Sequence, residues 1–194
     1  MMLQFDQHET PSELPLLSCG KFLGLLEGFY QGLPAAPSIE AALIVPDDIP
    51  QPQRRLLVHH RDMTSTLHRH YQEPIALRVL ERKLSGDWYY RHIVLQTGQS
   101  GRPIEYGAIR IDLPLLSEAA REEVLTAQTP LGSILNAHHL AYRCCPGAFF
   151  RIRPNELMHR VLQLQSPRWL YGRCNCLSDN ESRTIAEVIE ILPP

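Results

Sequence analysis

Arg91 is the residue whose position most clearly suggests binding chemistry. It lies in the segment 88–95 (WYYRHIVL), where alternation along a strand would put it on the same face as Ile93 and Leu95. A guanidinium on an apolar, core-facing surface is costly unless an acid or an anionic ligand neutralises it. Its planar fork suits a carboxylate. Two alternatives follow: an internal ion pair, for instance with Glu105 on the next strand, or a bound organic acid.

Two short motifs could supply backbone hydrogen bonds to the same anion. Met63 begins a predicted helix, and Leu131 and Gly132 lie in a Pro-Leu-Gly turn. The first N–H groups of a helix have no partner within it, and the helix dipole favours negative charge beside them. Met63, Leu131 and Gly132 are therefore candidate binding residues, provided that the fold brings them to Arg91.

The last predicted strand, 184–192, could supply an acid. Glu187 and Glu190 are three residues apart, so a strand would turn them to opposite faces. An inward-facing carboxyl would have its pKa raised by desolvation, which suits it to proton transfer or to hydrogen-bonding a hydroxyl. The alternative is a solvated glutamate on an edge strand. The sequence leaves open which of the two glutamates faces inward.

The elements that would position these residues predict an α+β fold. Turn residues and alternating hydrophobicity indicate an antiparallel meander followed by further strands, and Asp62 and Ser117 are suitable helix N-caps. We expect a sheet of about six strands with helices mainly on one face. The predicted helices are 62–71 and 117–128, with a weaker one at 21–30 and one turn at 133–138; the predicted strands are 75–84, 88–96, 104–113, 139–145, 149–153, 169–176 and 184–192, with 41–45 either a strand or a helix end.

Length and composition indicate one domain. A chain of 194 residues with 44% hydrophobic side chains can bury one well-formed core. We expect residues 1–54 to form an N-terminal arm and a helix packed on the core, the first twenty being poorly ordered, and residues 55–194 to form the core itself. The formal net charge of −2 gives no reason to expect nucleic acid as a partner.

The sequence also indicates a cytoplasmic protein without a membrane span. It has no apolar run of about 18 residues, and its start lacks the pattern of a signal peptide. The five cysteines are an odd number at spacings unsuited to disulfides, which favours reduced thiols.

Metal and thiol chemistry are the rival enzymatic hypotheses. The histidines and cysteines offer ligand atoms, but neither HExxH nor CxxC occurs, and the vicinal and His-x-His pairs lack the spacing of a structural zinc site. Cys144 or Cys145 could act as a nucleophile, although no partner for either is recognisable in the sequence. We therefore expect neither a metal nor another cofactor.

Several segments, in order, resemble the chorismate pyruvate-lyase family, more closely its archaeal, mycobacterial and cyanobacterial-type branch than the enterobacterial one. The resemblance covers roughly residues 55–194, and it depends on order and spacing because no single motif is diagnostic. The segments are Asp62-Met63-Thr64, Tyr90-Arg91-His92-Ile93-Val94-Leu95, Pro103-Ile104-Glu105-Tyr106-Gly107-Ala108-Ile109, Pro130-Leu131-Gly132-Ser133-Ile134-Leu135, Leu170-Tyr171-Gly172-Arg173 and Glu190-Ile191-Leu192-Pro193.

The resemblance implies a chorismate lyase-like fold and a cofactor-independent lyase that converts chorismate to 4-hydroxybenzoate and pyruvate for quinone biosynthesis. Arg91 would bind the ring carboxylate, the amides of Met63 and Leu131 would add hydrogen bonds, and Glu190 would meet the oxygen that becomes the 4-hydroxyl, with Glu187 as its substitute. A second cation should meet the pyruvyl carboxylate. The candidates are Arg78, Arg110, Arg143, Arg151 and Arg153.

The same fold also implies a non-catalytic alternative. It serves as the effector-sensing domain of some bacterial transcription regulators, which carry a DNA-binding winged helix ahead of the sensor. Residues 1–54 of this chain are Pro-rich and show no helix-turn-helix pattern. The alternative is therefore a binding or sensor protein for a small aromatic carboxylate.

Overall fold

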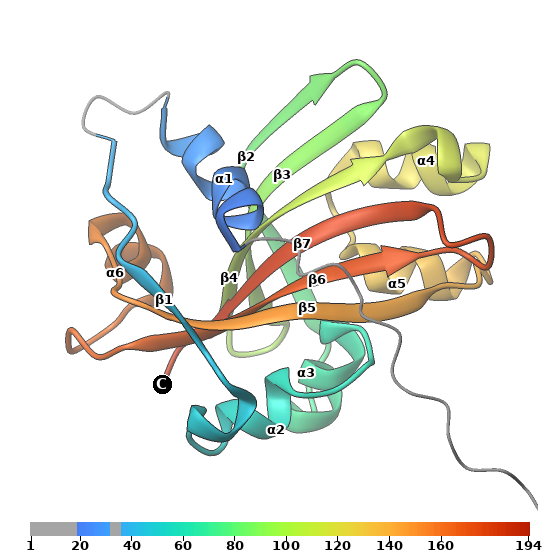
Figure 1. Cartoon of the computed structure of the whole chain (residues 1–194). Coiled ribbons are helices and arrows are strands. Elements are labelled where there is room, and N and C mark those ends of the chain that lie inside the picture. The colour runs from blue at the N-terminus through green and yellow to red at the C-terminus, as the bar shows by residue number, and fades with distance from the viewer. Residues whose placement is uncertain (1–18, 32–35) are drawn as a thin grey trace, which may run out of the picture.

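Seven antiparallel strands form one sheet in the computed structural model, which describes residues 19–31 and 36–194 (Figure 1). The strand order is β1-β5-β6-β7-β4-β3-β2, so two three-stranded meanders, β2-β3-β4 and β5-β6-β7, meet where β4 pairs with β7. The strands are β1 (Ala41–Ile44), β2 (Ile75–Ser85), β3 (Trp88–Thr97), β4 (Pro103–Asp112), β5 (Arg143–Ile152), β6 (Leu170–Ser178) and β7 (Thr184–Leu192).

Helices cover both faces of the sheet (Figure 1). On one face, α1 and α6 pack against apolar side chains of the central strands. On the other face, two neighbouring clusters form, one beneath α4 and α5 and the other beneath α2 and α3. The six α-helices of the described residues are α1 (Cys19–Tyr30), α2 (Gln53–Leu57), α3 (Met63–Tyr71), α4 (Glu118–Thr126), α5 (Leu131–Ala137) and α6 (Glu156–Leu162).

The predicted α+β fold with an antiparallel sheet is confirmed, and four of the six helices of the described residues, α2 to α5, lie on one face while α1 and α6 lie on the other. The sheet has seven strands because β1 pairs with β5 at its edge. The two strand pieces predicted at 139–145 and 149–153 belong to one strand, since β5 continues through a register shift between Pro146 and Ala148. Such a bulge is a position where a strand tolerates proline, which has no N–H to donate.

Two short helices, α2 and α6, were not predicted. None of the helices in the described part of the chain is long and apolar enough to cross a bilayer. The arm predicted for the first twenty residues lies almost entirely outside the described residues.

A buried polar network lies beneath α1. The Tyr30 and Tyr106 hydroxyls are 2.6 Å apart, and His92 Nε2 is hydrogen-bonded to the Tyr106 hydroxyl at 2.7 Å. The His92 ring also stacks on Phe29 at 5.1 Å between centroids. Burial lowers the pKa of His92 to about 4, because its surroundings stabilise the uncharged ring.

Acidification should therefore destabilise this protein through His92. Its pKa is lower in the folded than in the unfolded chain, so between pH 6.5 and pH 4 the unfolded state binds more protons and stability falls as pH falls. One such group contributes a slope of up to about 1.4 kcal/mol per pH unit. Urea unfolding of wild-type and His92→Gln protein across this range should show the smaller slope in the variant. Equal slopes would contradict the prediction.

Candidate functional site

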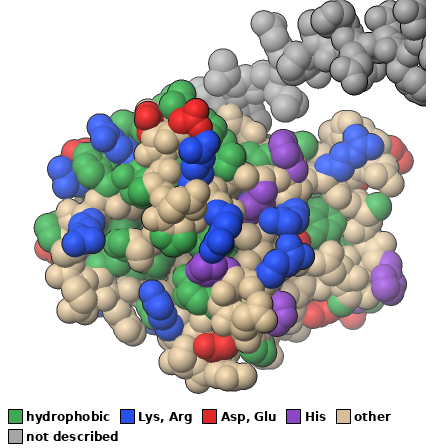
Figure 2. Space-filling model, turned by 90° about the horizontal axis from the view of Figure 1, so that it is seen from below, with side chains coloured by type: hydrophobic (Ala, Val, Ile, Leu, Met, Phe, Trp, Pro, Cys, Tyr) green, Lys and Arg blue, Asp and Glu red, His purple; other side chains and the backbone are tan. Residues whose placement is uncertain are grey.

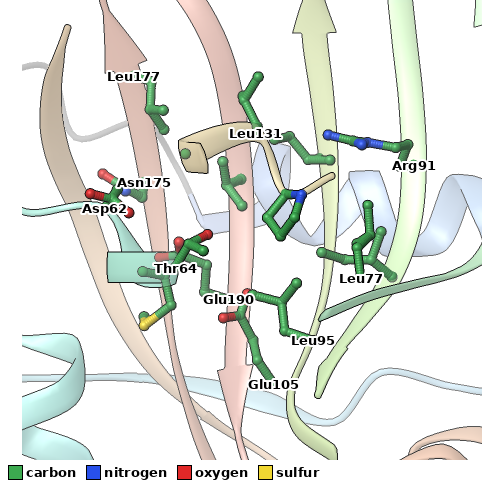
Figure 3. Close-up of a pocket in the computed structure, with 16 residues that line it drawn as sticks. Asp62, Thr64, Leu77, Arg91, Leu95, Glu105, Leu131, Asn175, Leu177 and Glu190 are labelled. Carbon is green, nitrogen blue, oxygen red and sulfur yellow. The ribbon is translucent and has the colours of Figure 1, made fainter. Parts of the chain in front are cut away.

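A cavity lies on the sheet face covered by α3 and α5 (Figure 3). Its volume is about 50 Å³, which is room for a few water-sized groups. Its walls are mostly apolar, with a few polar groups at opposite ends. The lining residues are Asp62, Met63, Thr64, Leu77, Arg91, Ile93, Leu95, Glu105, Ile109, Pro130, Leu131, Gly132, Asn175, Leu177, Val188 and Glu190.

Arg91 is a buried cation without a carboxylate partner among the described residues. Only 2% of its surface is exposed, and its Nη1 donates to the Thr129 carbonyl oxygen at 3.2 Å. Its Nε has no hydrogen-bond partner in the described part of the chain. The internal ion pair with Glu105 that the sequence left open does not form. Burial lowers the pKa of Arg91 to about 10, so the side chain stays charged at neutral pH.

Glu190 stands at the other end of the cavity, paired with a second buried arginine. Arg173 Nε donates to the Glu190 carboxylate, and Arg173 itself is 0% exposed. Its Nη1 donates to the carbonyl oxygens of Leu57 at 3.0 Å and His59 at 2.9 Å, and its Nη2 to that of Arg61 at 3.1 Å. Four of the five N–H donors of Arg173 are therefore engaged and its charge is balanced by Glu190, which it joins to the segment before α3.

Glu105 and Asn175 are the remaining buried polar groups of the lining; Glu105 lies near Glu190, and Asn175 lies beside Asp62 (Figure 3). Burial, and then the negative charge of Glu190, raise the pKa of Glu105 well above its usual range. Within the described residues, Glu105 Oε2 has no hydrogen-bond partner, whereas the Asn175 side chain is hydrogen-bonded to the Cys144 thiol. Buried polar groups are rarely left unsatisfied in proteins, so Glu105 Oε2 indicates a place for a ligand.

The backbone motifs predicted from the sequence meet at this cavity. Met63 begins α3, whose N-cap Asp62 accepts a hydrogen bond from Ser65 N, and Leu131 begins α5. Gly132 brings the two helix starts together, because a Cβ at this position would lie 2.8 Å from Asp62 Oδ1. Arg91 extends toward Leu131 (Figure 3).

Adding a methyl group at Gly132 should damage the cavity wall. In Gly132→Ala, the new Cβ would force the Asp62 carboxylate away from its cap position, which we expect to cost about 1–3 kcal/mol of stability. Gly147→Ala is the matched control, because a Cβ there meets no atom within 4 Å. Thermal unfolding of both variants checks this, and equal midpoints would contradict it.

Several predicted site residues lie elsewhere. Glu187 lies on the other face of the sheet, 2.5 Å from Arg110, and does not line the cavity. None of the five arginines proposed for a second carboxylate lines the cavity either. Arg78 donates to the Val161 carbonyl oxygen, and Arg110 pairs with Glu187. Arg143 is exposed, and Arg151 and Arg153 stack on Trp169. Among the described residues that line the cavity, Arg91 is the only arginine.

Arg173 and Asn175 are the site residues that sequence reasoning missed. Strand alternation places them on one face of β6 with Leu177, but the partners of Arg173 are far away in the sequence. No group of three histidine, cysteine or acidic side chains in the described ranges could hold a metal ion. Cys144 and Cys145 are not in disulfides, and burial raises the pKa of the Cys144 thiol to about 12, which disfavours a thiolate nucleophile.

Comparisons with known proteins show the fold. No family model matches the sequence, and no curated protein matches it significantly. PhnF from Mycobacterium smegmatis matches with a TM-score of 0.54 at 10% identity over 70% of this chain and 64% of PhnF. Its effector domain alone matches with a TM-score of 0.54 at 10% identity, over 68% of this chain and 88% of that domain. A GntR-family transcriptional regulator from Bacillus cereus matches more weakly, with a TM-score of 0.45 at 12% identity over 62% of this chain and 92% of that one.

These similarities concern architecture. The chain spans 64% of the length of PhnF, and at 10% identity the match shows a shared fold. The arrangement of strands and helices is that of the PhnF effector domain and is consistent with the predicted chorismate lyase-like fold.

Proposed function

We propose that this chain binds a small organic acid with one carboxylate, and that Arg91 is the counter-ion of that carboxylate. The observation that carries this proposal is the buried Arg91 guanidinium, which lines the cavity without an acidic partner among the described residues. A buried guanidinium without an anionic partner is unfavourable, whereas a bidentate carboxylate satisfies both its charge and its hydrogen bonds.

The charges of the cavity favour a ligand with a single carboxylate. Arg173 is committed to Glu190 and to three carbonyl groups, so Arg91 alone remains to neutralise an anion among the described lining residues. At the opposite end, Glu190 and Asn175 suit a hydroxyl or another hydrogen-bonding group. Apolar side chains such as Leu95 and Val188 lie between the two ends and suit a ring. An aromatic acid with a para hydroxyl, such as 4-hydroxybenzoate, has this pattern.

The fold supports a sensor role for such a binding site. One of the matching structures is the effector domain of PhnF, and the match covers 88% of that domain but 64% of full-length PhnF. We therefore propose that this chain binds a small molecule and reports its presence to another part of a protein or to a partner.

Calorimetric titration with aromatic acids tests the binding proposal. We expect 4-hydroxybenzoate to bind more tightly than benzoate, which lacks the hydroxyl, and phenol to bind weakly because it lacks the carboxylate. Removal of a charge-assisted contact should cost about tenfold or more in affinity. Equal affinities for 4-hydroxybenzoate and phenol would contradict the assignment of Arg91.

Chorismate lyase activity is the second candidate, favoured by the proximity of the Glu105 and Glu190 carboxyls. The raised pKa of Glu105 favours its acid form, whereas Glu190 has Arg173 as its counter-ion, so the two carboxyls could serve as acid and base within a single cavity. Loss of pyruvate from chorismate breaks the ring C–O ether bond, removes the proton from the neighbouring ring carbon, and protonates the departing enolpyruvate. Glu190 would accept the ring proton or orient the retained hydroxyl, and Glu105 would donate to the departing group.

Incubation with chorismate separates the two candidates. An enzyme would form 4-hydroxybenzoate and pyruvate in equal amounts above the spontaneous rate, which chromatography and a coupled pyruvate assay measure. Glu105→Gln should retain binding of 4-hydroxybenzoate, because the amide resembles the protonated acid, but should lose turnover by about 100-fold or more. Wild-type protein that binds 4-hydroxybenzoate without turning over chorismate would exclude the lyase.

A further inference from the structure

The surface formed by α2 and α3 carries an unusual concentration of positive charge. Residues 53–70 contain four arginines and four histidines but one acid, Asp62, in a chain whose net charge is −2. The view of Figure 2, from the side where α2 and α3 lie in Figure 1, shows several basic and histidine side chains gathered near its centre. This local excess is separate from the cavity, where Arg91 approaches from β3.

A hollow of about 330 Å³ lies within this surface. Three exposed arginines, Arg55, Arg61 and Arg69, line it together with His70, and none of its lining residues is acidic. Burial, and then the positive charges nearby, lower the pKa of His70, which is consistent with a positive potential in the hollow. We call Arg55, Arg61, Arg69 and His70 the basic hollow.

Nearby acids do not neutralise the basic hollow. Within the described residues, none of its arginines forms an ion pair with a carboxylate; Arg55 Nη2 instead lies 3.5 Å from His70 Nδ1. Asp62 is engaged as the N-cap of α3, and Glu73 accepts hydrogen bonds from backbone amides of the loop after β3. Three guanidinium groups therefore surround a concave space with their donors available.

We propose that the basic hollow binds a compact, multiply charged oxyanion, namely the phosphate or diphosphate group of a small soluble molecule. Guanidinium groups match phosphate oxygens with bidentate hydrogen bonds, and three of them around one space complement more than one negative charge. A concave site of this size fits one such group. Neighbouring arginines without acids also repel one another, and a bound anion would relieve this repulsion.

Calorimetric titration of the full chain with inorganic pyrophosphate, at low and at physiological salt, tests the proposal. Arg55→Ala/Arg69→Ala removes two exposed arginines of the hollow and should weaken binding by about tenfold or more. Arg143→Ala/Arg160→Ala is the matched control, because it removes the same charge from exposed positions that do not line the hollow. The control should bind as wild type, and so should Arg91→Met, which alters the cavity alone.

Three outcomes would overturn the proposal. Wild-type protein could fail to bind pyrophosphate at low salt, or the two double variants could lose affinity equally, which would indicate a general effect of net charge. The third outcome is binding of the hollow to phosphatidylserine vesicles in a sedimentation assay, or to a short DNA duplex in a mobility-shift assay, without any binding of pyrophosphate. It would assign the surface to a membrane or to a nucleic acid instead. Loss of aromatic-acid binding to the cavity would leave this result unaffected, so the two proposals fail separately.

Discussion

Arg173→Met should lower the free energy of unfolding by about 3–5 kcal/mol, as expected when one partner of a buried ion pair is removed. The substitution leaves the Glu190 carboxylate buried beside Glu105 without its cation, and three backbone carbonyls lose their donor. Urea unfolding followed by tryptophan fluorescence measures the loss. Failure of the variant to accumulate in folded form would agree with the same argument.

A double variant keeps this prediction testable. Arg173→Met/Glu190→Gln removes both charges, so no uncompensated carboxylate remains, and it should be more stable than Arg173→Met alone. The exposed Arg160 provides the control, since Arg160→Met should change stability by no more than about 0.5 kcal/mol. A loss below about 1 kcal/mol in Arg173→Met would show that the ion pair contributes little.

Arg91→Met should have the opposite profile: a large loss of binding with little loss of stability. Arg91 has one backbone hydrogen bond and no acidic partner among the described residues, so methionine leaves no charge uncompensated. We expect a stability within about 1 kcal/mol of wild type, or slightly higher, because a buried charge has been removed. Affinity for 4-hydroxybenzoate should fall by about 100-fold, as expected for a lost bidentate pair.

The contrast between the two arginines is the sharpest test of the site. Arg91→Lys keeps the charge but lacks the planar fork, and it should bind with an affinity between those of wild type and Arg91→Met. Calorimetry and urea unfolding on the same preparations give both quantities. If Arg91→Met unfolded as readily as Arg173→Met while retaining its affinity for 4-hydroxybenzoate, the role of Arg91 would be structural.

Local sequence signals predicted most of the fold. The strand β7 was predicted with its observed bounds because apolar residues dominate it, and α3 was predicted because Asp62 is a good N-cap. The strand β1 was ambiguous, since four residues are too few to establish a period. The helix α6 was missed although Asn155 caps it and apolar residues recur at helical spacing, so the signal was present but short.

The site was predicted less completely, because its contacts are distant in the sequence. Arg91 could be singled out from its strand neighbours, and the resemblance supplied its partners at 63 and 131. Arg173 bonds to Leu57, 116 residues away, and no local pattern indicates such a contact. The raised pKa of Glu105 likewise depends on its burial and then on Glu190, which comes near it through the pairing of β4 with β7.

The cavity forms only when β4 is paired with β7. Gly107 lies opposite Glu190 there, and a Cβ on Gly107 would fall 2.2 Å from the Ile189 carbonyl oxygen, so the strands pass closely. The first meander supplies Arg91 and Glu105, and the second supplies Asn175 and Glu190. Contacts so distant in sequence form only in the assembled chain, so neither meander alone can form the proposed binding site. A ligand that binds only the assembled cavity should therefore slow the hydrogen exchange of those amides that exchange through global unfolding. This slowing should extend along the whole sheet and not only around the cavity.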